Sequence, residues 1–304
     1  MTPSPAAVNR PLLSAALMLG GMATLGYTDN YVRVIATEGG LWQFHLFRSL
    51  MAAPVLLAAA MVLGFRLVPR RWPPVLVRSF LHATAMMIYF GCLAFLPVAI
   101  VAAGLFTAPI FVLLTTRLVF GQRFGPWRLL AVVLGFLGVV LMLGPAAGGV
   151  TALAVFPVVA AALYGLGNIA TRQWCEGESA ATLTAGFFAA LAVWGLLGLA
   201  VLALWRPEVP PGAEGSVLRG WVAPTSTFLF WTLVQAVGSL FGVALTVRAY
   251  QLSEASQVSV FEYSLLAFGA GWGWLLWGEV LSPSAGFGIG LIVASGAVIA
   301  LRSR

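Results

Sequence analysis

The chain has 304 residues, of which 61% are hydrophobic and only 8% are charged. A soluble globular domain carries about 25% charged residues, so this composition excludes an ordinary soluble protein and indicates a polytopic membrane protein. The formal net charge of +7 comes from 16 basic residues, all of them arginines at or near the ends of apolar runs or within them, and this scattered pattern does not favour nucleic-acid binding.

The first apolar run follows Arg10 and reads PLLSAALMLGGMATLG. Its length and basic flank resemble those of a signal peptide, but no convincing small-x-small cleavage site precedes Tyr27 and Asp29. We therefore expect a first transmembrane helix that is retained.

Apolar runs separated by Pro, Gly and Arg recur along the whole chain, and each is about 20 residues long, as a membrane-spanning helix requires. The expected spans are 12–34, 40–63, 75–96, 98–119, 126–144, 151–172, 181–204, 226–249, 255–277 and 284–301. Only the connections 64–74 and 205–224 are longer than a turn, which leaves little room for a soluble domain. The sequence predicts an all-α integral membrane protein with ten transmembrane helices.

The arginines indicate the direction of these spans. With a cytoplasmic N-terminus, the loops and span ends outside the cytoplasm contain only Arg206 and Arg219, while Arg33 and Arg48 fall within spans. The twelve arginines at the cytoplasmic side are then Arg10, Arg66, Arg70, Arg71, Arg78, Arg117, Arg123, Arg128, Arg172, Arg248, Arg302 and Arg304. The positive-inside rule therefore predicts that both termini lie in the cytoplasm, in a bacterial-type inner membrane.

An internal repeat relates the two halves of the chain. The stretches FTAPIFVLLTTRLVFGQRFGPW (106–127) and YSLLAFGAGWGWLLWGEVLSPS (263–284) align without gaps at an offset of 157 residues. We expect two five-helix repeats, 1–147 and 148–304, and they must be inverted because five crossings place the start of the second on the opposite side. Inverted repeats are typical of alternating-access transporters with a site near the midplane, although duplication can also build a bundle that transports nothing.

Polar residues within the spans are costly, about 2.5 to 3.5 kcal/mol for each charged group, so each should face a cavity or a partner. Asp29 and Arg48 fall at similar depths in the outer half of neighbouring antiparallel spans, which predicts an ion pair with Arg33 and His45 nearby. This group is either a lock between two helices or part of a substrate site or gate.

Glu262, followed by Tyr263, lies about 12 Å from the cytoplasmic start of its span and has no base close to it in sequence. Such a carboxylate suits proton coupling, and it can equally be held by hydrogen bonds from neighbouring helices. Other spans contribute further hydrogen-bonding groups. The candidate substrate-binding or gating residues are Asp29, Arg33, His45, Arg48, His82, Tyr89, Asn168, Gln235, Glu262 and Tyr263.

These stretches resemble the EamA-type transporters, the ten-helix branch of the drug/metabolite transporter superfamily. LFTAPIFVLLTTRLVFGQRFGPWRLLAVVLGFLGVVLMLGP resembles that family's fourth and fifth helices, and AYQLSEASQVSVFEYSLLAFGAGWGWLLWGEVL resembles its eighth-to-ninth segment. The sequence departs from the family pattern at Gln122, where a first-half Glu is usual, and at Leu266, where a second-half Pro is usual. The resemblance implies a bundle of two inverted halves around a central cavity, and export or uptake of small metabolites.

The first functional reading is a secondary transporter that exports amino acids or similar amphipathic compounds, with protons as a candidate coupling ion. The alternative is an uptake carrier for a vitamin or nucleoside-type metabolite such as riboflavin or S-adenosylmethionine. An intramembrane enzyme is disfavoured because the chain has no H-E-x-x-H pattern and no P-loop lysine, and a scaffold is disfavoured because no partner-binding domain is expected. No catalytic residue, metal or cofactor is predicted, and the expected partners are a small-molecule substrate and the lipid bilayer.

Overall fold

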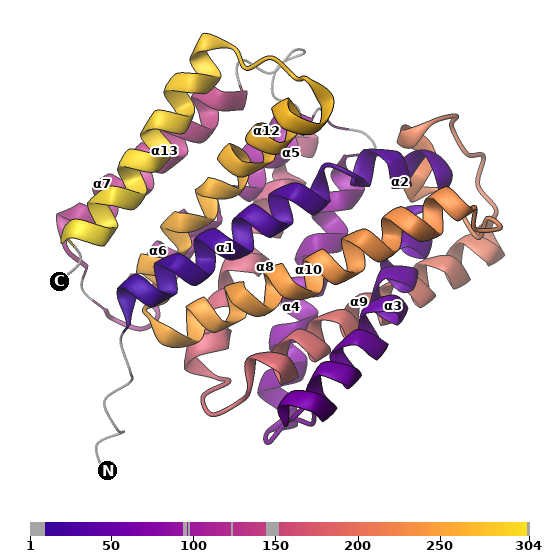
Figure 1. Ribbon diagram of the computed structural model, residues 1–304, viewed down its shortest axis with the longest axis horizontal. Coiled ribbons are helices and arrows are strands. Elements are labelled where there is room, and N and C mark those ends of the chain that lie inside the picture. Colours follow the sequence, from indigo (N-terminus) through magenta and orange to yellow (C-terminus); the bar gives the residue numbers. More distant parts are fainter. Residues whose placement is uncertain (1–9, 94–95, 97, 123, 144–151, 303–304) are drawn as a thin grey trace.

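The computed structural model describes residues 10–93, 96, 98–122, 124–143 and 152–302, and within these residues the regular secondary structure is entirely helical (Figure 1). The predicted boundary between the halves, at 147/148, lies outside the described residues, as do Arg123 and Arg304 of the arginine count.

Six of the ten expected spans are single unbroken helices. Each begins within three residues of its expected start and ends within four residues of its expected end. They are α3 (Leu41–Leu63), α4 (Trp72–Cys92), α7 (Pro126–Leu143), α9 (Ala180–Trp205), α10 (Ser226–Leu252) and α13 (Pro283–Arg302). The first span consists of α1 (Pro11–Asp29) and α2 (Val32–Glu38), the fourth of α5 (Val98–Leu105) and α6 (Ala108–Leu118), and the sixth of the short 3₁₀ turn η1 (Ala152–Ala154) and α8 (Val155–Gln173).

The expected span 255–277 is divided into three pieces. These are α11 (Ala255–Val258), the 3₁₀ turn η3 (Ser259–Tyr263) and α12 (Ser264–Trp277). Among the described residues, nine helical segments are long and apolar enough to cross a membrane, and this divided segment is the tenth of the expected set. The remaining 3₁₀ turn, η2 (Ala213–Val217), lies in the long connection before α10.

The fourth span is interrupted because of Pro109, which lies at the start of α6. A proline has no amide hydrogen to donate and its ring collides with the carbonyl four residues earlier, which here belongs to Leu105, the last residue of α5. The Thr107 hydroxyl donates to the Gly104 carbonyl at 2.6 Å across the break. At the repeat offset of 157 residues, Phe106 corresponds to Tyr263, where η3 gives way to α12. The two corresponding spans therefore break at corresponding positions.

The main helix contacts follow a regular pattern (Figure 1). Helix α1 packs against α10 and α12, while α8 packs against α4, α5 and α6; α3 pairs with α9, and α7 pairs with α13. The contacts repeat when each of the first five spans is replaced by the span five places later, and each of the last five by the span five places earlier. This exchange turns α1 into α8, α10 into α4 and α12 into α6. The α1–α10 contact then corresponds to α8–α4, and the α1–α12 contact to α8–α6.

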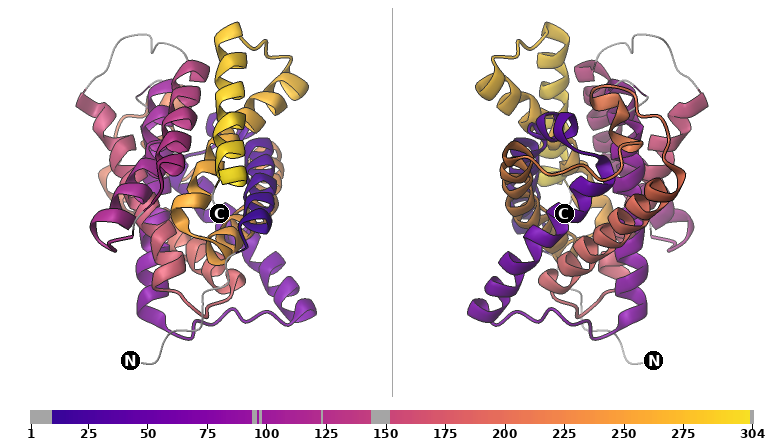
Figure 2. Two further views of the ribbon diagram at one scale, coloured as in Figure 1. Left: turned by 90° about the vertical axis from the view of Figure 1, so that its left-hand side faces the viewer. Right: turned by 90° about the vertical axis from the view of Figure 1, so that its right-hand side faces the viewer.

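Small residues allow α7 and α13 to pack closely, side by side. A Cβ atom placed on Gly138 would lie 2.6 Å from the carbonyl oxygen of Gly288 on the other helix, and one on Gly288 would meet Gly138 and Met142. Close backbone approach at small residues is a common means of helix association in membranes, where no hydrophobic effect drives helices together. Figure 2 also shows the far end of α3 projecting from the bundle, where Met61 and Val62 are largely exposed, as lipid-facing side chains would be.

Candidate functional site

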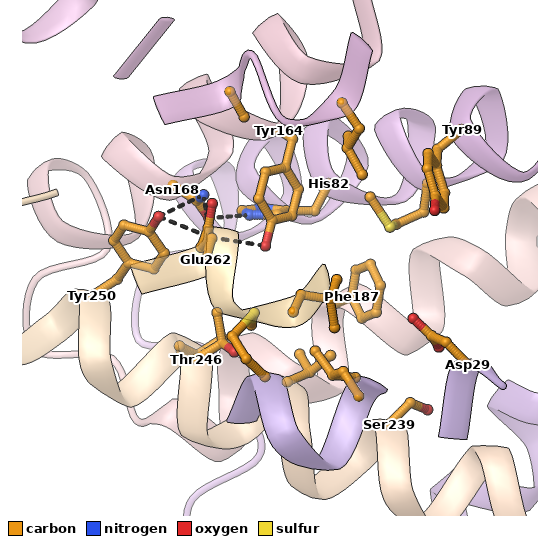
Figure 3. Close-up of a pocket in the computed structure, with 18 of the residues that line it drawn as sticks. Asp29, His82, Tyr89, Tyr164, Asn168, Phe187, Ser239, Thr246, Tyr250 and Glu262 are labelled. Carbon is orange, nitrogen blue, oxygen red and sulfur yellow. Dashed lines mark hydrogen bonds between the residues drawn. The ribbon is translucent and has the colours of Figure 1, made fainter. Parts of the chain in front are cut away.

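A cavity lies between α1, α4, α6, α8, α10 and η3, and we call it the central cavity (Figure 3). It holds about 1030 Å³ of empty space, part of which is open to solvent. Apolar side chains form much of its wall, among them Met22, Met86, Leu105, Phe106 and Phe187. The polar groups that line it gather in two clusters.

A second hollow of about 1160 Å³ lies beside α2 and the adjoining ends of α3 and α4, and we call it the vestibule. Asp29, Tyr89 and Phe90 line both the vestibule and the central cavity. These three residues therefore lie where the two spaces meet, with Asp29 and Tyr89 at the same end of the cavity in Figure 3.

The first polar cluster, the Gln235 cluster, consists of Asp29, Arg48 and Gln235. Gln235 Nε2 donates to Asp29 Oδ1 at 3.2 Å, and Arg48 Nη1 donates to Gln235 Oε1 at 3.3 Å. The expected proximity of Asp29 and Arg48 is observed, but the expected direct ion pair is not, because the Gln235 amide bridges them. Arg48 also lies over the rings of Phe44 and Phe188, at 5.4 and 5.5 Å from their centroids. Its Nε is buried without a hydrogen-bond partner among the described residues.

The second polar cluster, the Glu262 cluster, converges on a carboxylate in η3. Glu262 Oε1 accepts hydrogen bonds from the hydroxyls of Tyr250 at 2.8 Å and Tyr164 at 3.1 Å, and from Asn168 Nδ2 at 3.2 Å (Figure 3). Helix α8 supplies Tyr164 and Asn168, which are four residues apart and therefore share a face. Neighbouring helices therefore do donate hydrogen bonds to Glu262, which is one of the two alternatives that the sequence allows.

Asn168 connects this cluster to α4. Its Nδ2 also donates to the Tyr250 hydroxyl at 3.0 Å, and its Oδ1 lies 2.8 Å from His82 Nε2. His82 Nδ1 lies 3.1 Å from the backbone carbonyl oxygen of Arg78. Both ring nitrogens of His82 therefore face oxygens that accept hydrogen bonds, and a neutral ring, which has one N–H, satisfies only one of them at a time.

Arg78 is a cavity residue that the sequence analysis missed. The arginine distribution predicts a cytoplasmic position for Arg78, whose side chain is only 2% exposed and lines the central cavity. Its Nε donates to Thr171 Oγ1 at 3.0 Å and its Nη1 to the Leu183 carbonyl at 2.8 Å. The signal was its spacing of four residues from His82, which places both side chains on one face of α4.

The remaining predicted residues occupy different places. Arg33 lines the vestibule and forms an ion pair with Glu279 at 2.8 Å, each about half exposed, while its guanidinium lies 4.2 Å from the Trp277 ring centroid. His45 is buried beside Phe90, and neither of its ring nitrogens has a hydrogen-bond partner among the described residues.

Tyr263 faces away from the Glu262 carboxylate. Its hydroxyl donates to the Val132 carbonyl at 3.4 Å, and its ring lies 6.2 Å from that of Phe106. This contact joins residues that correspond at the offset of 157 residues, and Tyr263 is not among the residues that line the central cavity.

A second ion pair joins Arg128, at the start of α7, to Glu254, just before α11, and Arg128 also donates to the Ser256 hydroxyl at 2.9 Å. By the direction of the spans, this pair lies at the opposite end of the bundle from Arg33–Glu279. In both pairs an arginine of the first half contacts a glutamate of the second half. The described residues contain no group of three or more His, Cys, Asp or Glu side chains that could hold a metal ion.

Comparison with known proteins gives these features a context. The sequence profile of the EamA-like transporter family matches residues 12–144. The chain is 28% identical over 297 residues to the pseudopaline exporter CntI of Pseudomonas aeruginosa, covering 95% of this chain and 94% of the relative. It is 29% identical over 224 residues to a riboflavin transporter of Rhizobium johnstonii, covering 72% and 67% of the two chains.

A solved crystal structure matches the fold with a TM-score of 0.72 at 20% identity, covering 95% of this chain and 97% of the other. The family match in the first half, the transporter relatives along the whole length and the helical fold agree with the resemblance seen in the sequence. The first half of the chain therefore matches the EamA-like transporter family, the chain is similar over most of its length to proteins named as transporters, and its apolar helices are those of an integral membrane protein.

Proposed function

We propose that the protein is a secondary transporter that exports amino acids or similar amphipathic compounds across a bacterial-type inner membrane by alternating access. The observation that carries this proposal is the lining of the central cavity, where two acids and two arginines stand among apolar walls. Asp29, Glu262, Arg48 and Arg78 sum to zero charge when all are ionised, so the cavity suits a cargo that is polar and near neutral overall, with an apolar portion.

Two inverted repeats, 1–147 and 148–304, would supply the alternation. The helix contacts that map onto one another when the halves are exchanged support this assignment, as do the matching breaks at Phe106 and Tyr263. In transporters of this construction the substrate site lies between the repeats, and one repeat rocks against the other around it.

Both termini would lie in the cytoplasm, which the arginine distribution supports. In that orientation the vestibule and the Arg33–Glu279 pair face the outside, and the Arg128–Glu254 pair faces the cytoplasm. Each pair links the two halves at one end, so each is suited to hold that end closed during part of the cycle.

Protons are the proposed coupling ion, with Glu262 as their acceptor. Among the described residues no cation lies within ion-pair distance of this buried carboxylate, which is held by neutral donors. A charge in such a place is unfavourable unless it is paired, and uptake of a proton removes it. Glu262→Gln should therefore abolish the dependence of flux on a pH gradient, and a gradient response retained in this variant would rule out the coupling role.

Uptake of a vitamin or nucleoside-type metabolite, such as riboflavin or S-adenosylmethionine, is the second candidate function. Relatives named riboflavin transporters favour it, and so do the aromatic side chains of Tyr89, Phe106 and Phe187 in the cavity wall, which suit a flat ring system.

Flux into and out of proteoliposomes tests both candidates. Purified protein is reconstituted and supplied with a panel of amino acids or with riboflavin, with and without a pH gradient. We expect amino-acid flux that Asp29→Asn and Arg48→Ala impair at normal reconstitution yield. Transport of riboflavin with no amino-acid flux would replace the first function by the second, and unchanged amino-acid flux in both variants would exclude these residues from the site.

A further inference from the structure

The Gln235 cluster keeps an acid and a base close together without letting them pair. Asp29 and Arg48 both line the central cavity, and each bonds to one end of the same side-chain amide. Arg48 is buried, and its Nε has no hydrogen-bond partner among the described residues. A buried guanidinium with unused donors and no carboxylate in ion-pair contact is an unfilled site for an anionic group.

We propose that the Gln235 cluster is the head-group site for the cargo, and that it selects zwitterionic compounds with the head of an α-amino acid. The cargo carboxylate accepts hydrogen bonds from Arg48, and the cargo ammonium donates to Asp29. This inference deepens the proposed amino-acid function and rests on it. The cargo head takes over the two contacts that the Gln235 amide makes in the described structure.

The geometry of the amide supports this assignment. In the Gln235 side chain an acceptor and a donor are attached to one carbon, so they lie about 2.3 Å apart. In an α-amino acid the ammonium nitrogen and a carboxylate oxygen are separated by one bond more, a distance of about 3 Å. The amide therefore occupies the place of a zwitterionic head, with its acceptor toward the guanidinium and its donor toward the carboxylate.

Replacing the neutral amide by a zwitterion strengthens both contacts. Each present contact already has one ionised partner, and the charges of the cargo add the attraction of an opposite charge at the other end, which is strong where water is excluded. A cargo that lacks the ammonium leaves Asp29 without its charged partner, and a cargo that lacks the carboxylate leaves Arg48 without its own. The cluster therefore discriminates against amines and acids alike, because either one leaves a buried charge unpaired.

The position of the cluster allows a cargo to reach it. Asp29 lies where the vestibule meets the central cavity, so a head group can approach from the vestibule or from the cavity. Beyond the cluster the cavity wall presents Phe187, Val243 and Leu265, which can receive an apolar side chain. An apolar or aromatic α-amino acid fits both parts.

A crossed set of ligands and variants tests the proposal. Binding is measured by calorimetry on the purified full-length protein in nanodiscs, with leucine, methionine and phenylalanine, their carboxamides, and their N-acetyl derivatives. In the wild-type protein we expect each carboxamide and each N-acetyl derivative to bind at least about tenfold more weakly than its parent, as loss of one hydrogen bond between charged groups implies. Flux of the three parents in proteoliposomes is recorded in parallel.

The variants assign the two halves of the head group. Asp29→Asn should bind N-acetyl-phenylalanine and phenylalanine with similar affinity while still rejecting the carboxamide. Arg48→Gln should bind the carboxamide of phenylalanine and phenylalanine itself with similar affinity while still rejecting N-acetyl-phenylalanine. Thr232→Val, on the same helix as Gln235 and buried with a hydroxyl that has no hydrogen-bond partner among the described residues, is the matched control and should keep the wild-type pattern.

Two results would overturn the head-group site while leaving the proposed function intact. One is wild-type flux of the amino acids with equal affinity for parents and derivatives. The other is a uniform loss of affinity for all ligands in both variants, which is the result of a structural role. A wild-type protein that moves none of the three amino acids refutes the proposed function, and the head-group site with it.

Discussion

Asn168 ties the Glu262 cluster together, and Asn168→Ala should destabilise the protein. The side chain bonds to Glu262, Tyr250 and His82, which belong to three other elements of the bundle. Its loss leaves the carboxylate with two donors instead of three and removes the partner of His82 Nε2.

The expected cost follows from these three bonds. A hydrogen bond to a charged group contributes about 1.5 to 3 kcal/mol and a neutral one about 0.5 to 1.5 kcal/mol. Hydrogen bonds between membrane helices measure lower on average, at about 0.6 kcal/mol, because the unfolded chain in a bilayer also finds partners. Together these values place the loss at about 2 to 4 kcal/mol.

Reversible unfolding of the purified protein in mixed micelles, driven by increasing SDS, measures this loss. Ser239→Ala is the matched control, because Ser239 lines the same cavity but donates only to Ala236 of its own helix, at 3.3 Å. We expect the control to lose less than about 1 kcal/mol. If Asn168→Ala is no less stable than Ser239→Ala, the bonds of Asn168 do not hold the helices together and the account of this cluster is wrong.

Three further outcomes follow from features outside the clusters. Gly288→Leu should lower the free energy of unfolding by at least about 2 kcal/mol in the same assay, because the new side chain would separate α13 from α7. Gly290→Leu on the same helix is the control and should be neutral, because its side chain would enter open space. Equal effects of the two substitutions would refute the close packing of these helices. Glu279→Gln should lower the free energy of unfolding by only about 0.2 to 1 kcal/mol, because the ion pair with Arg33 is half exposed, and this difference should vanish in 0.5 M salt. A loss of stability that persists at high salt would contradict the exposure of the pair. Burial raises the pKa of the Cys175 thiol to about 11. In a Cys92→Ala variant, Cys175 of the folded protein should therefore react with a disulfide reagent at pH 7.4 about a hundredfold more slowly than in the unfolded protein, and its rate should rise about tenfold for each pH unit. Fast reaction of the folded protein at pH 7.4 would contradict the burial.

The expected spans agree well with the helices because a bilayer imposes one strong rule on sequence, a run of about 20 apolar residues for each crossing. The break within 255–277 could not be read in the same way. Its counterpart is explained by Pro109, but Leu266 stands at the matching position, so no local signal marks the turn η3. Of the donors that converge on Glu262, Tyr250 is 12 residues away in sequence, but Asn168 and Tyr164 of α8 are 94 and 98 residues away.

The proximity of Asp29 and Arg48 was predictable, and the side chain between them was not. Counting residues from the span ends placed Asp29 and Arg48 together, and both line the cavity. The bridging amide of Gln235 lies 206 residues from Asp29 in sequence, and hydropathy carries no information on such a pairing. Arg78 was missed for a related reason: an arginine near a span end is ordinarily a topology signal, and only the contacts with Thr171 and Leu183 distinguish it.

Helix α1 is synthesised first, yet it is packed against helices that are synthesised last. The Ser14 hydroxyl donates to the carbonyl of Ala249 at 2.6 Å, a partner 235 residues further along the chain, and Asn30 reaches Gly269 in the same way. At 5 to 20 residues per second, translation takes roughly 10 to 50 s to produce the first of these partners. During that time α1 remains in the bilayer without these partners, so its packing waits until α10 and α12 have left the ribosome.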